Sequence, residues 1–207
     1  MTSLPTSHVV PNTHPASVIA PFPVTLRVGA VAGLVSAAIL LLNVLKVAGV
    51  VPTITLTQLL APAGQGLAIF FVLALGGLAL TRQQRLAPLM TTLNALALAA
   101  GVGVEFVLNL VLRELPAAIR TDVLAGPLAP ALTIASVLLL IGSVGFCVLL
   151  WRAQIAPRAL AVGYALCATV VSMRPFVPEW LFLGALAALA LCILCLSVWM
   201  MTTQRRR

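Results

Sequence analysis

The chain contains six apolar stretches, each close to the length that a helix needs to cross a lipid bilayer. A helix of about 20 apolar residues spans the roughly 30 Å hydrocarbon core. Continuous stretches of this kind, without alternating segments of about ten residues, favour helices over a β-barrel. The fifth stretch is the shortest. The six lie at approximately 27–51, 61–81, 88–112, 128–151, 158–174 and 179–201. We therefore predict an all-α, polytopic membrane helix bundle with six transmembrane helices.

The composition supports a membrane protein and excludes a nucleic-acid partner. Of the 207 residues, 62% are hydrophobic and 8% are charged, whereas soluble domains contain about 25% charged residues. The net charge of +8 comes from residues in the short segments between apolar stretches, not from a basic patch interleaved with aromatics. We expect the lipid bilayer to be the principal partner. Small-residue helix faces leave room for a membrane-protein partner or a homo-oligomer.

The distribution of arginines predicts the orientation. If all six stretches cross the membrane, most arginines fall on one side, whereas Arg113 and Arg120 on the other side each lie close to an acidic residue. Cytoplasmic segments carry the excess of Lys and Arg. The arginines on the first side are Arg27, Arg82, Arg85, Arg152, Arg158 and Arg205 to Arg207. This predicts a multi-pass protein of the cell (inner or plasma) membrane with both termini cytoplasmic.

The remaining segments are short. Residues 1–24 contain five prolines and neither acidic residues nor Lys or Arg, a composition typical of a disordered cytoplasmic tail. Residues 25–203 form the predicted six-helix transmembrane domain, and 204–207 form a basic C-terminal tail. In the longest loop, 113–127, Pro116 and Gly126 suit a helix start and stop. A short surface helix and an ordinary loop both remain open there.

Glu105 is the most informative residue, because it lies inside the third apolar stretch. An unpaired ionisable residue in a spanning helix costs about 3 kcal/mol or more, and such residues mark candidate functional sites. Asn94, Gly101 and Asn109 share a helix face with Glu105 by their spacing. The first stretch brings Lys46 to a similar depth, and the fifth brings Arg174. The predicted polar cluster near the outer leaflet comprises Asn43, Lys46, Glu105, Asn109 and Arg174.

Two functions are compatible with this cluster. In the first, Glu105 pairs with Arg174 or Lys46 to hold helices together, and the protein is a structural or accessory membrane component acting through helix–helix interactions. In the second, the protein is a small permease or ligand-binding membrane protein. The cluster then lines an outward-facing, net positive site for a small anion or a proton-coupled substrate. Glu179 could neutralise Arg174 instead.

Catalytic constellations are missing from the predicted spans. They contain no histidine, which argues against paired-His haem ligation and most zinc sites. Ser143 is not centred between the neighbouring glycines, so it does not form a nucleophile elbow. All four cysteines lie in apolar stretches, where they resemble small hydrophobic residues. We expect no enzymatic activity, no metal site and no cofactor.

Three local features resemble a loose group of six-span bacterial integral membrane proteins that have no established activity. Glu105 is followed by Leu115-Pro116, and Gly126-Pro127-Leu128 opens the fourth stretch. A short basic turn with proline, 151–158, comes after that stretch. The resemblance covers roughly residues 60–160. It implies a six-span fold and a membrane location, and it implies no particular activity.

Overall fold

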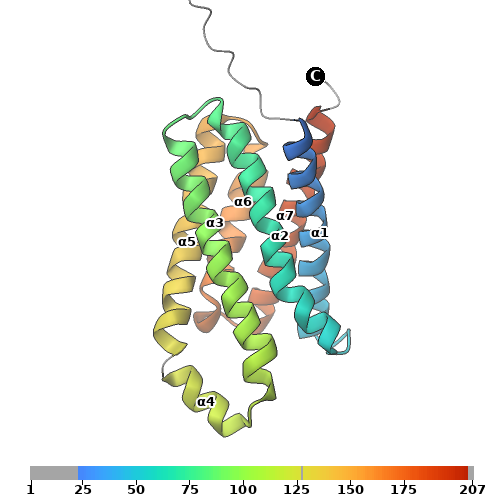
Figure 1. Cartoon of the computed structure of the whole chain (residues 1–207), viewed down its shortest axis with the longest axis vertical. Coiled ribbons are helices and arrows are strands. Elements are labelled where there is room, and N and C mark those ends of the chain that lie inside the picture. Colours follow the sequence, from blue (N-terminus) through green and yellow to red (C-terminus); the bar gives the residue numbers. More distant parts are fainter. Residues whose placement is uncertain (1–22, 127, 205–207) are drawn as a thin grey trace, which may run out of the picture.

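The computed structural model describes residues 23–126 and 128–204, and its regular elements are all helical (Figure 1). Five of the helices are long and apolar enough to cross a membrane. A π-helical turn and two short 3-10 turns interrupt the chain between α-helices. The α-helices are α1 (Pro23–Val47), α2 (Thr55–Leu80), α3 (Leu86–Phe106), α4 (Ala117–Ala125), α5 (Leu128–Ala153), α6 (Arg158–Ser172) and α7 (Glu179–Gln204).

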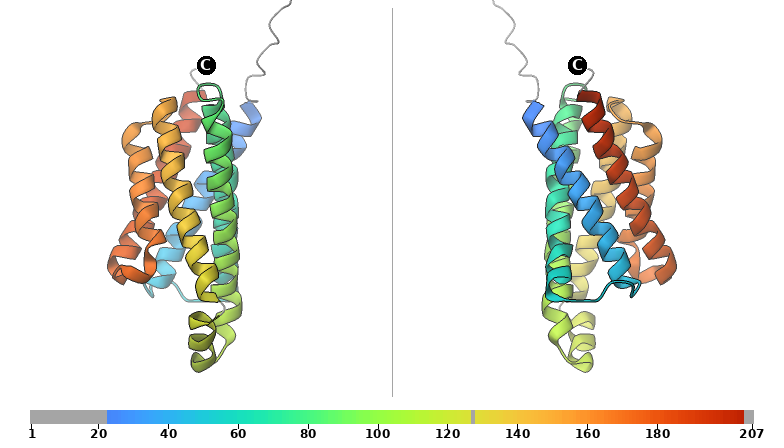
Figure 2. Two further views of the ribbon diagram at one scale, coloured as in Figure 1. Left: turned by 90° about the vertical axis from the view of Figure 1, so that its left-hand side faces the viewer. Right: turned by 90° about the vertical axis from the view of Figure 1, so that its right-hand side faces the viewer.

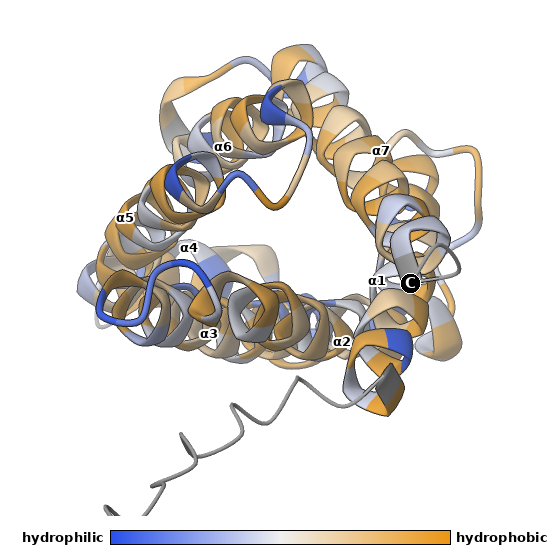
Figure 3. Ribbon diagram, turned by 90° about the horizontal axis from the view of Figure 1, so that it is seen from above, coloured by the Kyte–Doolittle hydropathy of each residue, from blue (hydrophilic) through white to orange (hydrophobic). Residues whose placement is uncertain are grey.

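Six of these helices form a closed ring. Going round it, α1 packs on α2, α2 on α3, α3 on α5, α5 on α6, α6 on α7, and α7 returns to α1. Figure 3 shows this ring along the bundle axis, and Figure 2 shows the helices running side by side. The short α4 lies outside the ring at one end, where it contacts α5. No helix lies in the middle of the ring, so all six helices border its interior.

The two ends of the bundle carry different charges. The start of α1, the α2–α3 and α5–α6 connections and the end of α7 lie together at the end opposite α4 (Figure 1). We call this the arginine end, and the opposite one the α4 end. The exposed arginines at the arginine end are Arg27, Arg82, Arg85, Arg152 and Arg158. All four acidic residues of the chain, Glu105, Glu114, Asp122 and Glu179, belong to the α4 half.

The outer circumference of the ring is apolar, as expected for helices in lipid. Large hydrophobic side chains are exposed around it, among them Phe70 at 55%, Ile134 at 67% and Leu166 at 63%. Exposing so much apolar surface to water would be unfavourable, whereas contact with lipid acyl chains is not. The structure therefore confirms a polytopic helical membrane protein.

Most predicted stretches are confirmed as helices with somewhat different ends. The fifth stretch forms α6, which has 15 residues and a length of about 22 Å, less than the roughly 30 Å of a hydrocarbon core. The number of crossings and the cytoplasmic location of the termini thus stay predictions. The short surface helix in the 113–127 loop is confirmed as α4. The predicted tails, 1–24 and 204–207, lie mostly outside the described residues.

Helix α2 begins six residues before the predicted stretch, and Thr57 explains the difference. Its hydroxyl donates to the carbonyl of Ile54 (2.9 Å) and accepts from the Ile54 N–H (3.1 Å), which satisfies backbone groups at the start of the helix. Pro62 consequently lies inside the helix, where it is buried. Prolines are tolerated in membrane helices when neighbouring groups re-satisfy the backbone.

The half of the bundle nearer the arginine end is tightly packed. Six of its large side chains are at most 1% exposed, and each belongs to the half of its helix nearer that end. They are Phe71, Leu75, Phe146, Leu149, Leu150 and Leu196. In the described part of the half nearer α4, Leu112 at 2% exposure is the most buried side chain of this size. The packed half therefore provides the rigid core on which the other half is built.

Glycines bring neighbouring helices of the ring into close contact. A Cβ atom on Gly33 would collide with Ser197 on α7 and Phe71 on α2, and one on Gly76 would collide with Thr91 on α3. At Gly142 it would lie 3.0 Å from the Cα of Asn94, a backbone atom that cannot rotate away. Small residues permit such approaches in membranes, where van der Waals contact replaces the hydrophobic driving force. Gly33, Gly76 and Gly142 thus each mark a close contact between two helices of the ring.

We predict that Gly142→Val lowers the stability of the bundle by about 1–3 kcal/mol, because the added atoms meet α3 backbone. The matched control is Gly77→Val, since open space surrounds a Cβ atom at Gly77. That control should change stability by less than about 0.5 kcal/mol. Thermal or denaturant unfolding of the purified proteins in one detergent measures both. Equal losses in the two variants would contradict the packing assigned to Gly142.

Candidate functional site

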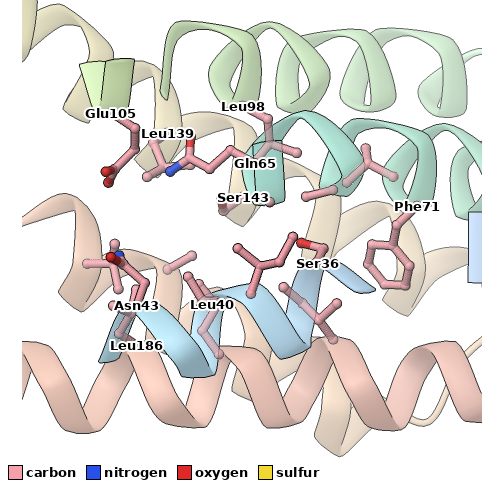
Figure 4. Close-up of a pocket in the computed structure, with 18 of the residues that line it drawn as sticks. Ser36, Leu40, Asn43, Gln65, Phe71, Leu98, Glu105, Leu139, Ser143 and Leu186 are labelled. Atoms are coloured by element: carbon pink, nitrogen blue, oxygen red, sulfur yellow. The ribbon is translucent and has the colours of Figure 1, made fainter. Parts of the chain in front are cut away.

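A cavity extends from the middle of the bundle toward the α4 end, and all six ring helices line it (Figure 4). Its volume accessible to water-sized molecules is about 70 Å³, and it is partly open to the surroundings. Its walls are mainly leucine, isoleucine and alanine side chains. The polar lining residues are Ser36, Asn43, Gln65, Glu105, Ser143 and Tyr164. A mostly apolar cavity with a few convergent polar groups is the usual form of a small-molecule site.

Glu105 lines the cavity from α3 and is held by its neighbour Asn109. The amide nitrogen Nδ2 of Asn109 donates to Oε2 of Glu105 at 2.7 Å and to the Glu105 backbone oxygen at 2.9 Å. The other face of the same amide, Oδ1, accepts from the Lys46 ammonium at 2.9 Å. Asn109 therefore links a carboxylate on α3 to an ammonium on α1 without direct contact between the two charges.

A π-helical turn places Asn109 in this position. Regular α-helix ends at Phe106, and Val107–Val111 form a π-turn in which the N–H of Leu112 bonds the carbonyl of Val107. Such a turn widens the helix by one residue and is frequent at functional sites. The sequence predicted that Glu105 and Asn109 share a face, but it carries no signal for the π-turn.

Lys46 is almost completely buried, with 9% of its surface exposed. It lies in the last turn of α1, where a positive charge interacts favourably with the free carbonyl groups of the helix end. The helix stops just beyond it at Gly49, whose φ of 76° only glycine adopts without strain. Lys46 is not a lining residue of the cavity, because its ammonium is directed to Asn109. Its role is to complete the polar link behind Glu105.

Asn43 and Gln65 carry buried oxygen atoms that have no hydrogen-bond partner. The two atoms are Oδ1 of Asn43 and Oε1 of Gln65, both in the cavity wall. Asn43 lies across the cavity from Glu105, and the side chains point toward one another (Figure 4). Gln65 fits against α3 because position 101 is glycine, where a Cβ atom would collide with its Oε1. The α4 end of the cavity thus holds one carboxylate and two amides from three helices.

A second polar group lies where the cavity meets the packed core. Asn94, fully buried on α3, donates through Nδ2 to the Tyr164 hydroxyl at 3.2 Å. The Tyr164 ring meets Phe146 edge-on with the centroids 6.3 Å apart. The oxygen Oδ1 of Asn94 is buried without a partner, and Ser143 lies beside the Tyr164 hydroxyl. A buried polar group without a hydrogen bond costs about 1–3 kcal/mol, so this region favours water or ligand atoms over an empty space.

Arg174 lies apart from the other predicted cluster residues. Helix α6 ends at Ser172, and Arg174 begins a 3-10 turn on which its side chain is exposed. Its guanidinium lies 4.7 Å from the centre of the Phe182 ring, a cation–π contact. Among the described residues it forms no ion pair with Glu105 or Glu179. The structure therefore brings Lys46, Glu105 and Asn109 together, places Asn43 across the cavity from them, and leaves Arg174 outside the group.

The resulting electrostatics differ from a net positive pocket. Among the described residues that line the cavity, Glu105 is the one acidic or basic residue, since Lys46 lies behind Asn109 and Arg174 is outside. The other polar lining groups are amides and hydroxyls. The sequence did not identify three lining residues, Gln65, Ser143 and Tyr164, as site residues. A lone Gln in an apolar stretch is the signal that could have identified Gln65. This wall suits a ligand that donates hydrogen bonds.

The comparisons with known proteins find no match for the chain among protein-family models, curated proteins or solved structures. The resemblance to six-span bacterial membrane proteins therefore stays a prediction, and no family is identified. The described residues also contain no group of three or more His, Cys, Asp or Glu side chains suited to a metal ion.

We predict that Lys46 and Asn109 contribute to stability as a pair. In a double-mutant cycle with Lys46→Met and Asn109→Leu, the coupling energy should be about 0.5–2 kcal/mol, the range for interhelical hydrogen bonds in membranes and for residues in contact. The same cycle with Arg174→Met and Glu105→Gln should be additive within about 0.5 kcal/mol, because those residues do not touch. Unfolding in detergent measures both cycles. Strong coupling in the second cycle alone would contradict the arrangement.

Proposed function

We propose that the protein is a small ligand-binding membrane protein or permease whose site is the central cavity. The observation that carries this proposal is a cavity lined by all six ring helices that contains a carboxylate and several unpartnered buried oxygens. A bundle kept only for packing gains nothing from these groups, because each unsatisfied one lowers its stability. Polar groups inside membrane proteins usually face a site or a water-filled path.

A second cavity supports the permease form of this proposal. It lies at the arginine end, lined by residues of α1, α2 and α7 and by the α2–α3 and α5–α6 connections, including Arg82, Gln154 and Thr203. The packed core around Phe71 and Leu75 separates it from the central cavity. Two cavities on either side of a packed layer suit a protein in which access alternates between the two membrane faces.

A structural or accessory role is the alternative. The Lys46–Asn109 hydrogen bond joins α1 to the end of α3, and Gly33 and Gly142 bring further helix pairs into close contact. These features account for the stability of the ring. They do not account for the oxygens of Asn43 and Gln65 in a cavity wall, and for this reason we favour the ligand-binding function.

We further propose that α6 is a sixth crossing and that the arginine end is cytoplasmic. Helix α6 packs lengthwise between α5 and α7, and the 3-10 turn Arg174–Phe176 extends it toward the α4 end. The described arginine end carries arginines without acidic residues, whereas cations and acids are mixed at the α4 end. This asymmetry favours a cytoplasmic arginine end in the cell membrane.

Water access to the cavity tests the proposed function. In a variant whose four cysteines are replaced by alanine, Asn43→Cys should react with a membrane-impermeant methanethiosulfonate, and Ser36→Cys should react more slowly because it lies deeper. The control is Val35→Cys, adjacent to Ser36 but 44% exposed on the outside of the ring. It should remain unlabelled in lipid vesicles. If the two cavity positions are as unreactive as Val35→Cys, the cavity is dry and the structural alternative holds.

Reporter fusions test the topology. Alkaline phosphatase, which is active only outside the cytoplasm, should be inactive when fused after Gln154 or Gln204 and active when fused after Asp122 or Val177. The Gln154 and Val177 fusions decide whether α6 crosses the membrane. Equal activity at these two positions would reduce the number of crossings to five, and inverted activities at all four would reverse the orientation.

A further inference from the structure

We propose that the central cavity binds a small organic amine, with its ammonium group between Glu105 and Asn43 and its apolar body against the leucine-lined wall. This inference rests on the proposed function and specifies the chemical class of the ligand. It replaces the anion expected from a net positive pocket, because the structure places both candidate cations outside the cavity wall.

The cavity wall offers a carboxylate as the charged partner of the amine. Glu105 is the one acidic or basic residue among the described residues that line the cavity, and its Oε2 accepts the hydrogen bond from Asn109. The described residues supply no hydrogen bond to Oε1. Lys46 lies near enough to interact electrostatically, but its ammonium donates its hydrogen bond to Asn109 and not to the carboxylate. Asn109 thus orients the carboxylate while leaving one oxygen for a ligand, and a carboxylate in apolar surroundings favours a positively charged partner.

The acceptor oxygens in the cavity wall match the hydrogen-bond donors of an ammonium group. An alkylammonium group has three N–H donors and no acceptor. The unpartnered Oδ1 of Asn43 lies in the wall that faces Glu105 (Figure 4), so one ammonium group can donate to both side chains. Gln65, with a further unpartnered oxygen, lies on the neighbouring helix. A carboxylate ligand would offer only acceptors to these oxygens and would be repelled by Glu105.

The aliphatic wall of the cavity matches an apolar body on the ligand. Between the α4 end of the cavity and its polar floor at Ser143 and Tyr164, the wall consists of aliphatic side chains, and no charged group interrupts it. These side chains are Ile39, Leu40, Leu98, Leu139, Leu186 and Leu189. Glu105 and Asn94 on α3 are about 16 Å apart along the helix. The cavity therefore fits an amine with a short alkyl or aryl body better than a bare inorganic cation, which would leave the aliphatic wall unused.

The experiment compares three probes of equal length: hexylamine, 1-hexanol and hexanoate. Their binding to the purified full-length chain in an uncharged detergent is measured by isothermal titration calorimetry, and empty micelles serve as the blank. We expect hexylamine to bind at least tenfold more tightly than the other two. Glu105→Gln should weaken hexylamine binding at least tenfold. The matched control, Glu179→Gln, removes an exposed acid at the same end of the bundle and should leave the affinity unchanged.

Asn43→Leu provides a second test that leaves the Lys46–Asn109–Glu105 link intact, so it decides the matter if Glu105→Gln fails to fold. It should weaken hexylamine binding several-fold and leave hexanol binding unchanged. If hexylamine and hexanol bind equally and neither responds to Glu105→Gln or Asn43→Leu, the amine is the wrong ligand class, while the cavity remains a ligand site. If no probe binds, the amine class is overturned. If in addition Asn43→Cys resists labelling, the proposed function fails as well.

Discussion

The carboxylate of Glu105 is the constraint around which the α4 half of the bundle is arranged. An isolated charge surrounded by aliphatic side chains is strongly unfavourable, and it persists only with hydrogen bonds and a counter-charge nearby. The structure supplies both through one amide: Asn109 donates to Glu105 and accepts from Lys46. The π-turn positions that amide at the point where α3 packs on α2. The π-turn therefore both shapes the end of the helix and positions the amide that hydrogen-bonds the buried carboxylate.

The two halves of the bundle differ: the half at the arginine end is densely packed, and the half at the α4 end contains the cavity. Toward the arginine end, close glycine contacts and fully buried aromatic and leucine side chains produce a dense core. Toward the α4 end, the same six helices enclose a cavity with polar groups at both of its ends. In lipid, where burial of apolar surface does not drive helices together, dense packing is the main source of stability. A cavity is therefore tolerable in one half because the other half is packed so closely.

The ring arrangement also explains why the site has contributions from the whole chain. No helix occupies the centre, so every helix of the ring presents one face to the cavity. Each contributes at most a few polar residues: Asn43 from α1, Gln65 from α2, Glu105 from α3, Ser143 from α5 and Tyr164 from α6. Small relative movements of two helices would change the distance between these groups. Such coupling of the site to helix packing is what a permease requires.

The sequence by itself determined the membrane solvent, the helical class and most helix positions, because about 20 consecutive apolar residues have few alternatives in a bilayer. It also determined that Glu105 and Asn109 lie on one face, since their spacing follows the helical repeat. Only the tertiary structure decided which charges meet. Lys46 reaches Asn109 because α1 and α3 both border α2, while the break after Ser172 turns Arg174 toward Phe182. Those outcomes depend on the order of helices round the ring and on a π-turn. Neither leaves a local signal in the sequence, because both arise from contacts between segments far apart in the chain.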